Sequence, residues 1–340
     1  MATLRDLSKH LGISVTQVSR ALNGHDDVSE ATKQRVMDAA KKLGYSANIS
    51  ARMLKSGRSG IVAMVVDVAA ERDVPDVLMA GVFGLSTSFA RRDMQLMLHA
   101  MPEGDDPVET HAKLARSGLI DGFIIVNPQA PEDPRIAFLE RENVPFVVHG
   151  RDRIAPDYPY VDIDNHRVGY TLTRYLLGLG HRRIAMVEGV EGAAFSTARL
   201  AGHVAALAEA DLKPDGALVR QAPMTEVVGR QSMHDLLSLR DRPTAVIAGN
   251  TMLAAGIYTA IAEHGFQLGA DISVVAHDDR LPRLPAEDFS PALTVTESAI
   301  SASAEPLVDL LIARITAPQA KAEARLLPVS FVERDSAHPH

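Results

Sequence analysis

The chain has 340 residues, of which 46% are hydrophobic and 23% are charged, a balance typical of a globular protein with two or three domains. It contains no cysteine, which excludes disulfides, thiol nucleophiles and cysteine zinc sites. The net charge of −8 hides an asymmetry, because residues 1–60 carry ten Lys and Arg against five Asp and Glu, whereas the rest carries 25 against 38. A small basic module therefore precedes a large acidic one.

The start of the chain predicts two short helices joined by a turn. Thr3 and the acid three residues later are typical of a helix start, and Gly12 interrupts the apolar pattern. Ser14 and Gln17 then form an S-x-x-Q capping box that opens a second helix over 15–22.

Two helices joined by a glycine-containing turn in a basic segment are typical of a helix-turn-helix, and a third helix is expected between Ser29 and Gly44. The second helix would pack Val18 and Leu22 inward and present its polar side to a DNA groove. Arg20 would be its best donor for a guanine edge. A surface helix in an ordinary three-helix bundle would show the same pattern.

Nearly sixty residues resemble the lactose-repressor/galactose-repressor (LacI/GalR) family of bacterial transcription regulators, through TLRDLSKHLGISVTQVSRALNG, VSEATKQRVMDAAKKLGY and YSANISARMLKSGRSG. Ala47 stands where the family pattern has a proline. The resemblance implies a hinge helix at 48–54, with Leu54 as the wedge inserted into the minor groove of DNA; the alternative is that Leu54 packs on the large domain. The DNA-binding residues that the resemblance and the pattern indicate are Thr3, Ser14, Val15, Thr16, Gln17, Ser19, Arg20, Asn23, Asn48, Ala51 and Leu54.

After residue 60, short β-rich runs alternate with amphipathic helical patterns. The expected strands are 61–66, 95–98, 122–126, 146–149, 183–187, 244–248 and 272–276, and the clearest helices are 108–116, 168–177, 200–210 and 252–264. This alternation predicts doubly wound parallel sheets, and more than 250 residues of it predict two subdomains. Ligands of such sheets bind at the carboxyl ends of the strands, so we expect a cleft between the subdomains.

This region is similar to the regulatory region of the same family, which is itself similar to periplasmic sugar-binding proteins, through DIDNHRVGYTLTRYLLGLGHRRIAMVEG, ARLAGHVAAL, GADISVVAHDD and LLPVSFVER. The expected architecture is an N-terminal all-α helix-turn-helix domain and an α/β regulatory domain of two doubly wound parallel-sheet subdomains. The expected boundaries are 1–45 for the DNA-binding domain, 46–59 for the hinge helix and linker, and 60–340 for effector binding and dimerisation, with subdomain one at about 60–161 and 292–324 and subdomain two at about 162–291 and 325–340.

The same resemblance places Arg199 where a guanidinium reaches effector oxygens and Asp278 where a carboxylate accepts from effector hydroxyls, which suits a carbohydrate or a derivative. A salt bridge between the subdomains is the alternative role for each charged candidate. The expected effector-binding residues are Asp67, Arg151, Asp162, Arg199, Met224, Asn250 and Asp278. Three departures weaken the likeness to a sugar pocket: Gly249-Asn250 replaces Asn-Asp, Met224 replaces a stacking aromatic, and Asp76-Val77 replaces an aromatic pair.

Phosphate-loop, dinucleotide-binding, serine-hydrolase and zincin motifs are absent from the sequence, so we expect no enzyme, no cofactor and no metal. Two acidic pairs, Asp162-x-Asp164 and Asp278-Asp279, could hold Mg²⁺ but fit a crossover and a cleft carboxylate better.

The function expected is a repressor that binds double-stranded operator DNA as a homodimer and responds to an effector. The dimer would form through the first regulatory helix, including Val82, Leu85 and Phe89. The alternative is a free-standing sugar-binding protein. The first ten residues lack an apolar segment behind their charges and no apolar run approaches membrane-spanning length, so we expect a cytoplasmic protein without a membrane partner.

Overall fold

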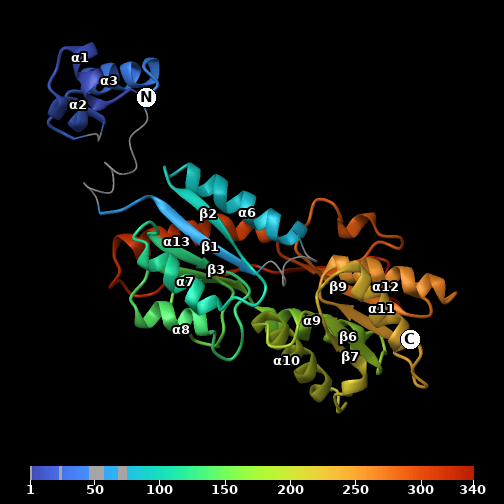
Figure 1. The fold of residues 1–340 in the computed structure, drawn as a ribbon. Helices are drawn as coiled ribbons and strands as arrows, with labels where there is room; N and C mark the ends of the chain where they lie inside the picture. The colour runs from blue at the N-terminus through green and yellow to red at the C-terminus, as the bar shows by residue number, and fades with distance from the viewer. Residues whose placement is uncertain (1, 23–24, 46–56, 68–74) are drawn as a thin grey trace. The chain divides into compact units, whose positions relative to one another are not determined.

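The computed structural model describes residues 2–22, 25–45, 57–67 and 75–340, which form two compact units, Met1–Ser59 and Gly60–His340 (Figure 1). In the described residues, no helix combines the length and the apolar character needed to cross a membrane.

The first unit contains the three predicted helices, α1 (Leu4–Leu11), α2 (Val15–Leu22) and α3 (Glu30–Lys42). Both predicted helix starts are confirmed. Thr3 and Asp6 cap α1 reciprocally, and the Ser14 hydroxyl accepts from the backbone N–H of Gln17 at 3.1 Å. Gly12 ends α1 with φ of 68°, a left-handed conformation that costs glycine little. The three helices share one small core, made of Leu7, Val18, Ala21, Val36, Ala39 and Ala40.

The second unit contains two six-stranded sheets, each covered by helices on both faces, as the alternating pattern predicts. The first sheet has the order β11-β5-β4-β3-β1-β2 and is parallel throughout; the second has the order β12-β10-β9-β8-β6-β7, and only β12 is antiparallel. The strands are β1 (Ile61–Asp67), β2 (Gln95–Met101), β3 (Gly122–Ile125), β4 (Phe146–His149), β5 (Tyr160–Ile163), β6 (Ile184–Glu188), β7 (Val219–Gln221), β8 (Ala245–Ala248), β9 (Ser273–Asp278), β10 (Thr294–Glu297), β11 (Ala324–Leu327) and β12 (Ser330–Val332).

Strand β1 shows why an uninterrupted apolar run forms a strand here. Its alternate side chains enter two different cores: Val62 and Met64 face α6 (Pro75–Ala90) and α13 (Ala304–Thr316), whereas Ala63 and Val65 face α7 (Pro107–Arg116) and α8 (Pro134–Arg141). The second sheet is covered in the same way by α9 (Asn165–Gly178), α10 (Ala194–Glu209), α11 (Glu226–Leu237) and α12 (Thr251–Glu263).

Sheet pairing corrects two of the expected subdomain boundaries. Residues 294–297 were assigned to the first subdomain, but β10 pairs with β9 in the second sheet. Residues 325–327 were assigned to the second subdomain, but β11 pairs with β5 in the first sheet. The chain therefore crosses between the subdomains after β5, after β10 and after β11. These three strands lack the run of three apolar residues that is found in each expected strand, so their sequence alone does not assign them.

The dimer surface expected on α6 is also corrected. Leu85 and Phe89 are 4% and 0% exposed because they pack into the core of their own subdomain against α13, and Val82 packs against the same core. The exposed apolar side chains of α6 are Met79 and Phe83, which is 65% exposed. The hydrophobic residues of α6 therefore occupy two faces, and the prediction took the inner face for the outer one.

Glycines let α9 and α10 approach each other closely. A Cβ at Gly169 would lie 2.0 Å from the carbonyl oxygen of Arg199, and a Cβ at Gly202 would lie 2.0 Å from that of His166. Neither gap can hold a carbon atom, so both positions need glycine. The same arrangement recurs between α11 and α12 at Gly229 and Gly256.

We predict that Gly202→Ala lowers the free energy of unfolding by about 3 kcal/mol or more, because the new methyl group must push two helix backbones apart. Urea unfolding followed by circular dichroism measures the loss. Gly178→Ala is the matched control, because a Cβ there meets nothing within 4 Å. Equal stability of the two variants would contradict the close helix contact.

Candidate functional site

A cavity of about 150 Å³ lies between the two subdomains, at the carboxyl ends of strands from the first sheet, as the topology predicts. Its walls combine charged and amide side chains with a few apolar ones. The chief lining residues are Asn127, Arg151, Asp162, Asn165, Phe195, Arg199, Met224, Asp279 and Ile300.

The guanidinium of Arg199 is a buried positive charge in the wall of this cavity. The side chain is 6% exposed, its Nε donates to Asn165 Oδ1 and its Nη1 to the carbonyl oxygen of Gly249, each at 2.8 Å. Within the described residues Nη2 makes no hydrogen bond, so its two protons remain for a ligand. The helix contact through Gly169 and Gly202 sets the position of this side chain.

Asp162 faces Arg199 from the first subdomain. Its Oδ2 pairs with Arg151 Nε at 3.0 Å, and its Oδ1 accepts from the Asn165 amide at 3.0 Å. Burial raises the pKa of Asp162 to about 6, and the neighbouring Arg151 opposes that rise. Asn165 therefore links an acceptor in one subdomain to the guanidinium of the other.

Three more titratable groups surround Arg199. Burial raises the pKa of Asp279 to about 6 and also raises the pKa of Glu188, whose Oε1 lies 3.7 Å from Arg199 Nη1. Burial lowers the pKa of His277 well below its ordinary value, and Arg199 adds to that shift. The imidazole of His277 is therefore neutral at pH 7, so Arg199, and Arg151 through its pairing with Asp162, supply the positive charge beside these carboxylates.

Of the seven expected effector-binding residues, Arg151, Asp162, Arg199 and Met224 line the cavity. The carboxylate in the wall at the end of β9 is that of Asp279 and not that of Asp278, which corrects the expectation. Asp278 is fully buried as the last residue of β9, and its Oδ1 accepts from the backbone N–H of Arg280 at 2.6 Å. The fixed direction of side chains at the strand end decides which of two adjacent acids reaches the cavity.

Asn250 and Asp67 do not line the cavity either. Asn250 is fully buried and caps α12 through its Oδ1, which accepts from the Leu253 N–H at 2.9 Å. Asp67 is the last residue of β1, next to residues 68–74, which lie outside the described residues.

Sequence reasoning missed Phe195 and Glu188. Phe195 lines the cavity with its ring 5.4 Å from the Arg199 guanidinium carbon, so the pocket retains an aromatic face. Its spacing of four residues from Arg199 on a helix was the available signal. Glu188 ends a buried strand, and Gly249 makes room for it, since a Cβ at 249 would lie 2.5 Å from its Oε1.

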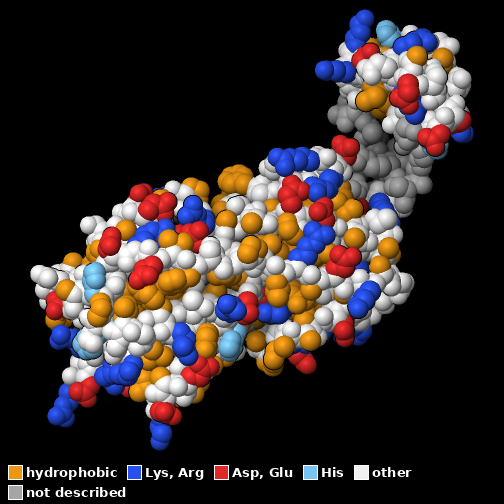
Figure 2. All heavy atoms as spheres, turned by 180° about the vertical axis from the view of Figure 1, so that it is seen from behind, with side chains coloured by type: hydrophobic (Ala, Val, Ile, Leu, Met, Phe, Trp, Pro, Cys, Tyr) orange, Lys and Arg blue, Asp and Glu red, His pale blue; other side chains and the backbone are white. Residues whose placement is uncertain are grey.

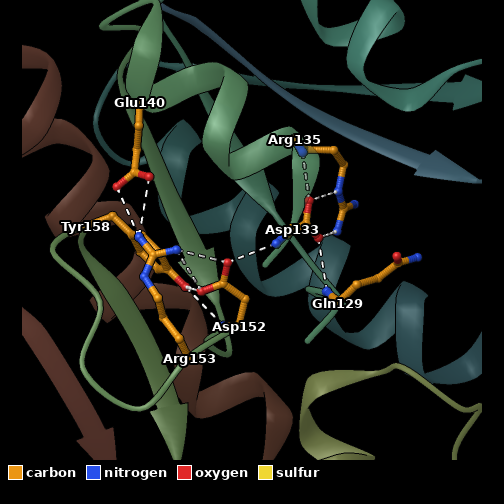
Figure 3. A network of polar contacts seen from close by, with 7 residues as sticks. All are labelled: Gln129, Asp133, Arg135, Glu140, Asp152, Arg153 and Tyr158. Carbon is orange, nitrogen blue, oxygen red and sulfur yellow. Dashed lines mark hydrogen bonds and ion pairs between the residues drawn. The ribbon is translucent and has the colours of Figure 1, made fainter. Parts of the chain in front are cut away.

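A polar network holds one wall of the cleft in place (Figure 3). Asp133 caps α8, accepts from the Gln129 N–H at 3.0 Å and pairs with Arg135. Asp152 accepts from the Asp133 N–H at 3.0 Å and from the Tyr158 hydroxyl at 2.6 Å. The loop fixed in this way reaches the other subdomain, where the Ala130 N–H donates to Gly192 and the Ala194 N–H to Pro128.

In the first unit, α2 has the two faces that the sequence predicts. Val18 and Ala21 are buried, whereas Ser14, Val15, Thr16, Gln17 and Arg20 are exposed and Ser19 is half-buried. Thr3 is exposed at the start of α1. The predicted residues Asn23, Asn48, Ala51 and Leu54 lie outside the described residues.

Arg20 is held by an acid. Its Nε donates to Asp27 Oδ1 at 3.1 Å, its Nη2 pairs with Oδ2, and this hydrogen bonding lowers the pKa of Asp27.

Figure 2 shows basic and acidic side chains interspersed on the drawn face of each unit. In the part of the chain that the structure describes, no group of three or more His, Asp or Glu is arranged to hold a metal ion.

Comparisons with known proteins agree with this architecture. Residues 3–48 match the family of bacterial regulatory proteins called the lacI family, and residues 173–337 match the periplasmic binding protein-like domain. The HTH-type transcriptional regulator AglR of Rhizobium meliloti (strain 1021) is 39% identical over 337 residues, which cover 99% of this chain and 94% of AglR.

Two solved structures share the fold over almost the whole chain. The complex of the transcriptional regulator CelR with cellobiose has a TM-score of 0.72 and 27% identity, covering 99% of this chain and 100% of that one. The lac repressor dimer bound to operator and the anti-inducer ONPF has a TM-score of 0.80 and 24% identity, covering 99% of each chain. As the sequence resemblance predicts, the chain belongs to the lacI family of bacterial transcriptional regulators.

Proposed function

We propose that this regulator represses transcription by binding a pseudo-palindromic operator as a dimer, and that a carbohydrate or carbohydrate derivative in the cavity controls this binding. The observation that carries the proposal is a cavity with a buried guanidinium on one side and carboxylates on the other, in a chain that begins with a helix-turn-helix. The protein would act in the cytoplasm, where the operator is, and the proposal assigns it no catalytic step.

The chemistry of the cavity favours a ligand with many hydroxyl groups. Arg199 offers N–H donors to ligand oxygens, while Asp162 and Asp279 offer acceptors to hydroxyl protons. Phe195 adds an aromatic face of the kind that packs on the C–H surface of a sugar ring. CelR, which shares this fold, is described in complex with cellobiose, and that supports the same ligand class.

DNA recognition would use the exposed side of α2, with Arg20 as the main reader of base edges and Ser14, Val15, Thr16, Gln17 and Ser19 beside it. Asn23, Thr3 and the hinge residues Asn48, Ala51 and Leu54 stay predictions of the sequence. Asp27 competes with DNA for the Arg20 guanidinium, so base contact requires Arg20 to exchange the Asp27 carboxylate for the neutral acceptors of a base edge. The lac repressor structure, described with its operator, supports this use of the fold.

We predict that the protein binds DNA from upstream of its own gene tightly and with strong salt dependence, and that one compound in a panel of sugars, sugar acids and polyols shifts the affinity. Fluorescence anisotropy at two salt concentrations measures this.

Arg20→Ala should weaken operator binding by about 1–3 kcal/mol per half-site and relax its sequence preference. Asp27→Asn is the matched variant, which leaves Arg20 in place and should increase affinity for both operator and unrelated DNA. An Arg20→Ala variant that loses both DNAs equally would contradict base reading.

The dimer that a palindromic site requires would use the outer face of α6. We predict that Phe83→Asp raises the dimer dissociation constant at least about tenfold, because it places a charge where an exposed aromatic side chain would be buried. Sedimentation velocity at graded concentrations measures the change. Ile154→Asp, at a side chain that is 92% exposed in the same subdomain, is the control and should leave the dimer intact. A Phe83→Asp protein that dimerises like the control would exclude this face.

The raised pKa values of the cavity carboxylates give a prediction for pH. Asp162 ionises near pH 6 in the folded protein and near 3.8 in the unfolded chain, so the folded state binds protons more strongly between these values. The free energy of unfolding contributed by this group therefore falls as the pH rises from 4 to 6. We predict a weaker pH dependence over this window in Asp162→Asn, measured by urea unfolding at several pH values. An unchanged slope would contradict the burial of this carboxylate.

A further inference from the structure

A second cavity lies entirely within the second subdomain, away from the cleft. This peripheral cavity has a volume of about 330 Å³ and lies between α10, the start of β6 and residues 213–219. Its apolar wall is formed by side chains of α10 and of the segment before β7, namely Leu200, Val204, Leu207 and Leu218.

The rim of the peripheral cavity carries positive charge that is not fully compensated. All three guanidinium nitrogens of Arg183 already have partners, because Nε and Nη2 donate to the carbonyl oxygen of Asp241 and Nη1 pairs with Asp215. Among the described residues, Arg182 donates only through Nη1, to the backbone carbonyls of Leu177 and His181. Lys213 is exposed, and its ammonium has no hydrogen bond or ion pair among the described residues. Arg182 and Lys213 therefore line this space with donors that the described residues do not use, in a unit that is acidic as a whole.

The wall also contains a neutral acceptor. His203 is 3% exposed and lines the cavity, and its Nδ1 lies 2.8 Å from the Thr173 hydroxyl oxygen. That hydroxyl donates its only proton to the carbonyl oxygen of Gly169 at 2.7 Å, so it must accept from Nδ1–H. Burial lowers the pKa of His203 to about 4, which keeps the ring neutral at pH 7. Nε2 therefore carries a lone pair, and it has no partner among the described residues.

We propose that the peripheral cavity binds a small amphipathic anion, with a carboxylate at Arg182 and Lys213, an apolar body on the α10 wall, and a hydroxyl or N–H donor at His203 Nε2. Each part of the ligand meets a group of matching chemistry: charge-assisted hydrogen bonds at the rim, apolar contact in the middle and a neutral acceptor inside. A purely apolar ligand would make no use of the rim cations or of His203 Nε2, and a cation would meet the positive charges of Arg182 and Lys213.

The test uses the full chain and 4-hydroxyphenylacetate, which carries a carboxylate, an aromatic body and a hydroxyl donor. Isothermal titration should give a dissociation constant on the order of 1 mM, as befits a ligand of about eleven non-hydrogen atoms. Phenylacetate, which lacks the hydroxyl, should bind roughly three- to tenfold more weakly. Tyramine keeps the ring and the hydroxyl but replaces the carboxylate with an ammonium group, and it should not bind.

Variants and histidine NMR locate the site. Lys213→Glu should weaken 4-hydroxyphenylacetate binding at least about fivefold, whereas Lys321→Glu, a matched exposed lysine that lines neither cavity, should not. In protein with ¹⁵N-labelled histidine, the ligand should shift the Nε2 resonance of His203, assigned by its loss in His203→Gln, and phenylacetate should leave it unchanged. The proposal is overturned by absence of binding up to about 10 mM, by equal binding of tyramine, by equal effects of the two lysine variants or by an unmoved His203 signal.

Discussion

The buried guanidinium of Arg199 is the charge on which the cleft depends. A buried cation is stable only with fixed partners. The Arg199 guanidinium donates to the Asn165 side-chain oxygen and to the Gly249 carbonyl oxygen, and the Glu188 carboxylate lies nearby. Its field opposes the pKa rise that burial imposes on Asp162, Glu188 and Asp279. Replacing it would therefore leave Glu188 and Asp279 without their compensating cation, whereas Asp162 would keep its pairing with Arg151.

The backbone places this charge through close contacts. Gly169 and Gly202 let α9 and α10 touch, which sets the depth of Arg199, and Gly249 leaves room for Glu188. On the opposite wall, the network around Asp133 and Asp152 fixes a loop that hydrogen-bonds across the cleft. The two subdomains meet through these elements, so a ligand bound between them would act on their relative pose. A ligand that prefers one pose must change operator affinity by the same coupling free energy if the DNA prefers another.

Local signals predicted much of the fold. The capping residues Thr3, Ser14 and Ser29 placed the helices of the first unit, because a cap involves only its own first turn. Seven apolar runs predicted seven strands that the structure contains, but the short strands β5, β7, β10, β11 and β12, none of which has three consecutive apolar residues, were missed. Pairing with distant partners defines such short strands, and it leaves no periodicity in the sequence. The same limit produced the misplaced boundaries around residues 294–297 and 325–327.

The sequence by itself determined the inward and outward sides of α2, because these follow from residue spacing within one element. It also determined the order of domains and the family, because charge, alternating patterns and motifs can be read along the chain. Only the tertiary structure decided that Asp279 rather than Asp278 faces the cavity, that Leu85 and Phe89 are covered by α13, and that Phe195 lies against Arg199. Those facts depend on the twist of a strand end and on which neighbouring element packs against each helix face. Both are set by contacts between residues far apart in the chain, which no local pattern records.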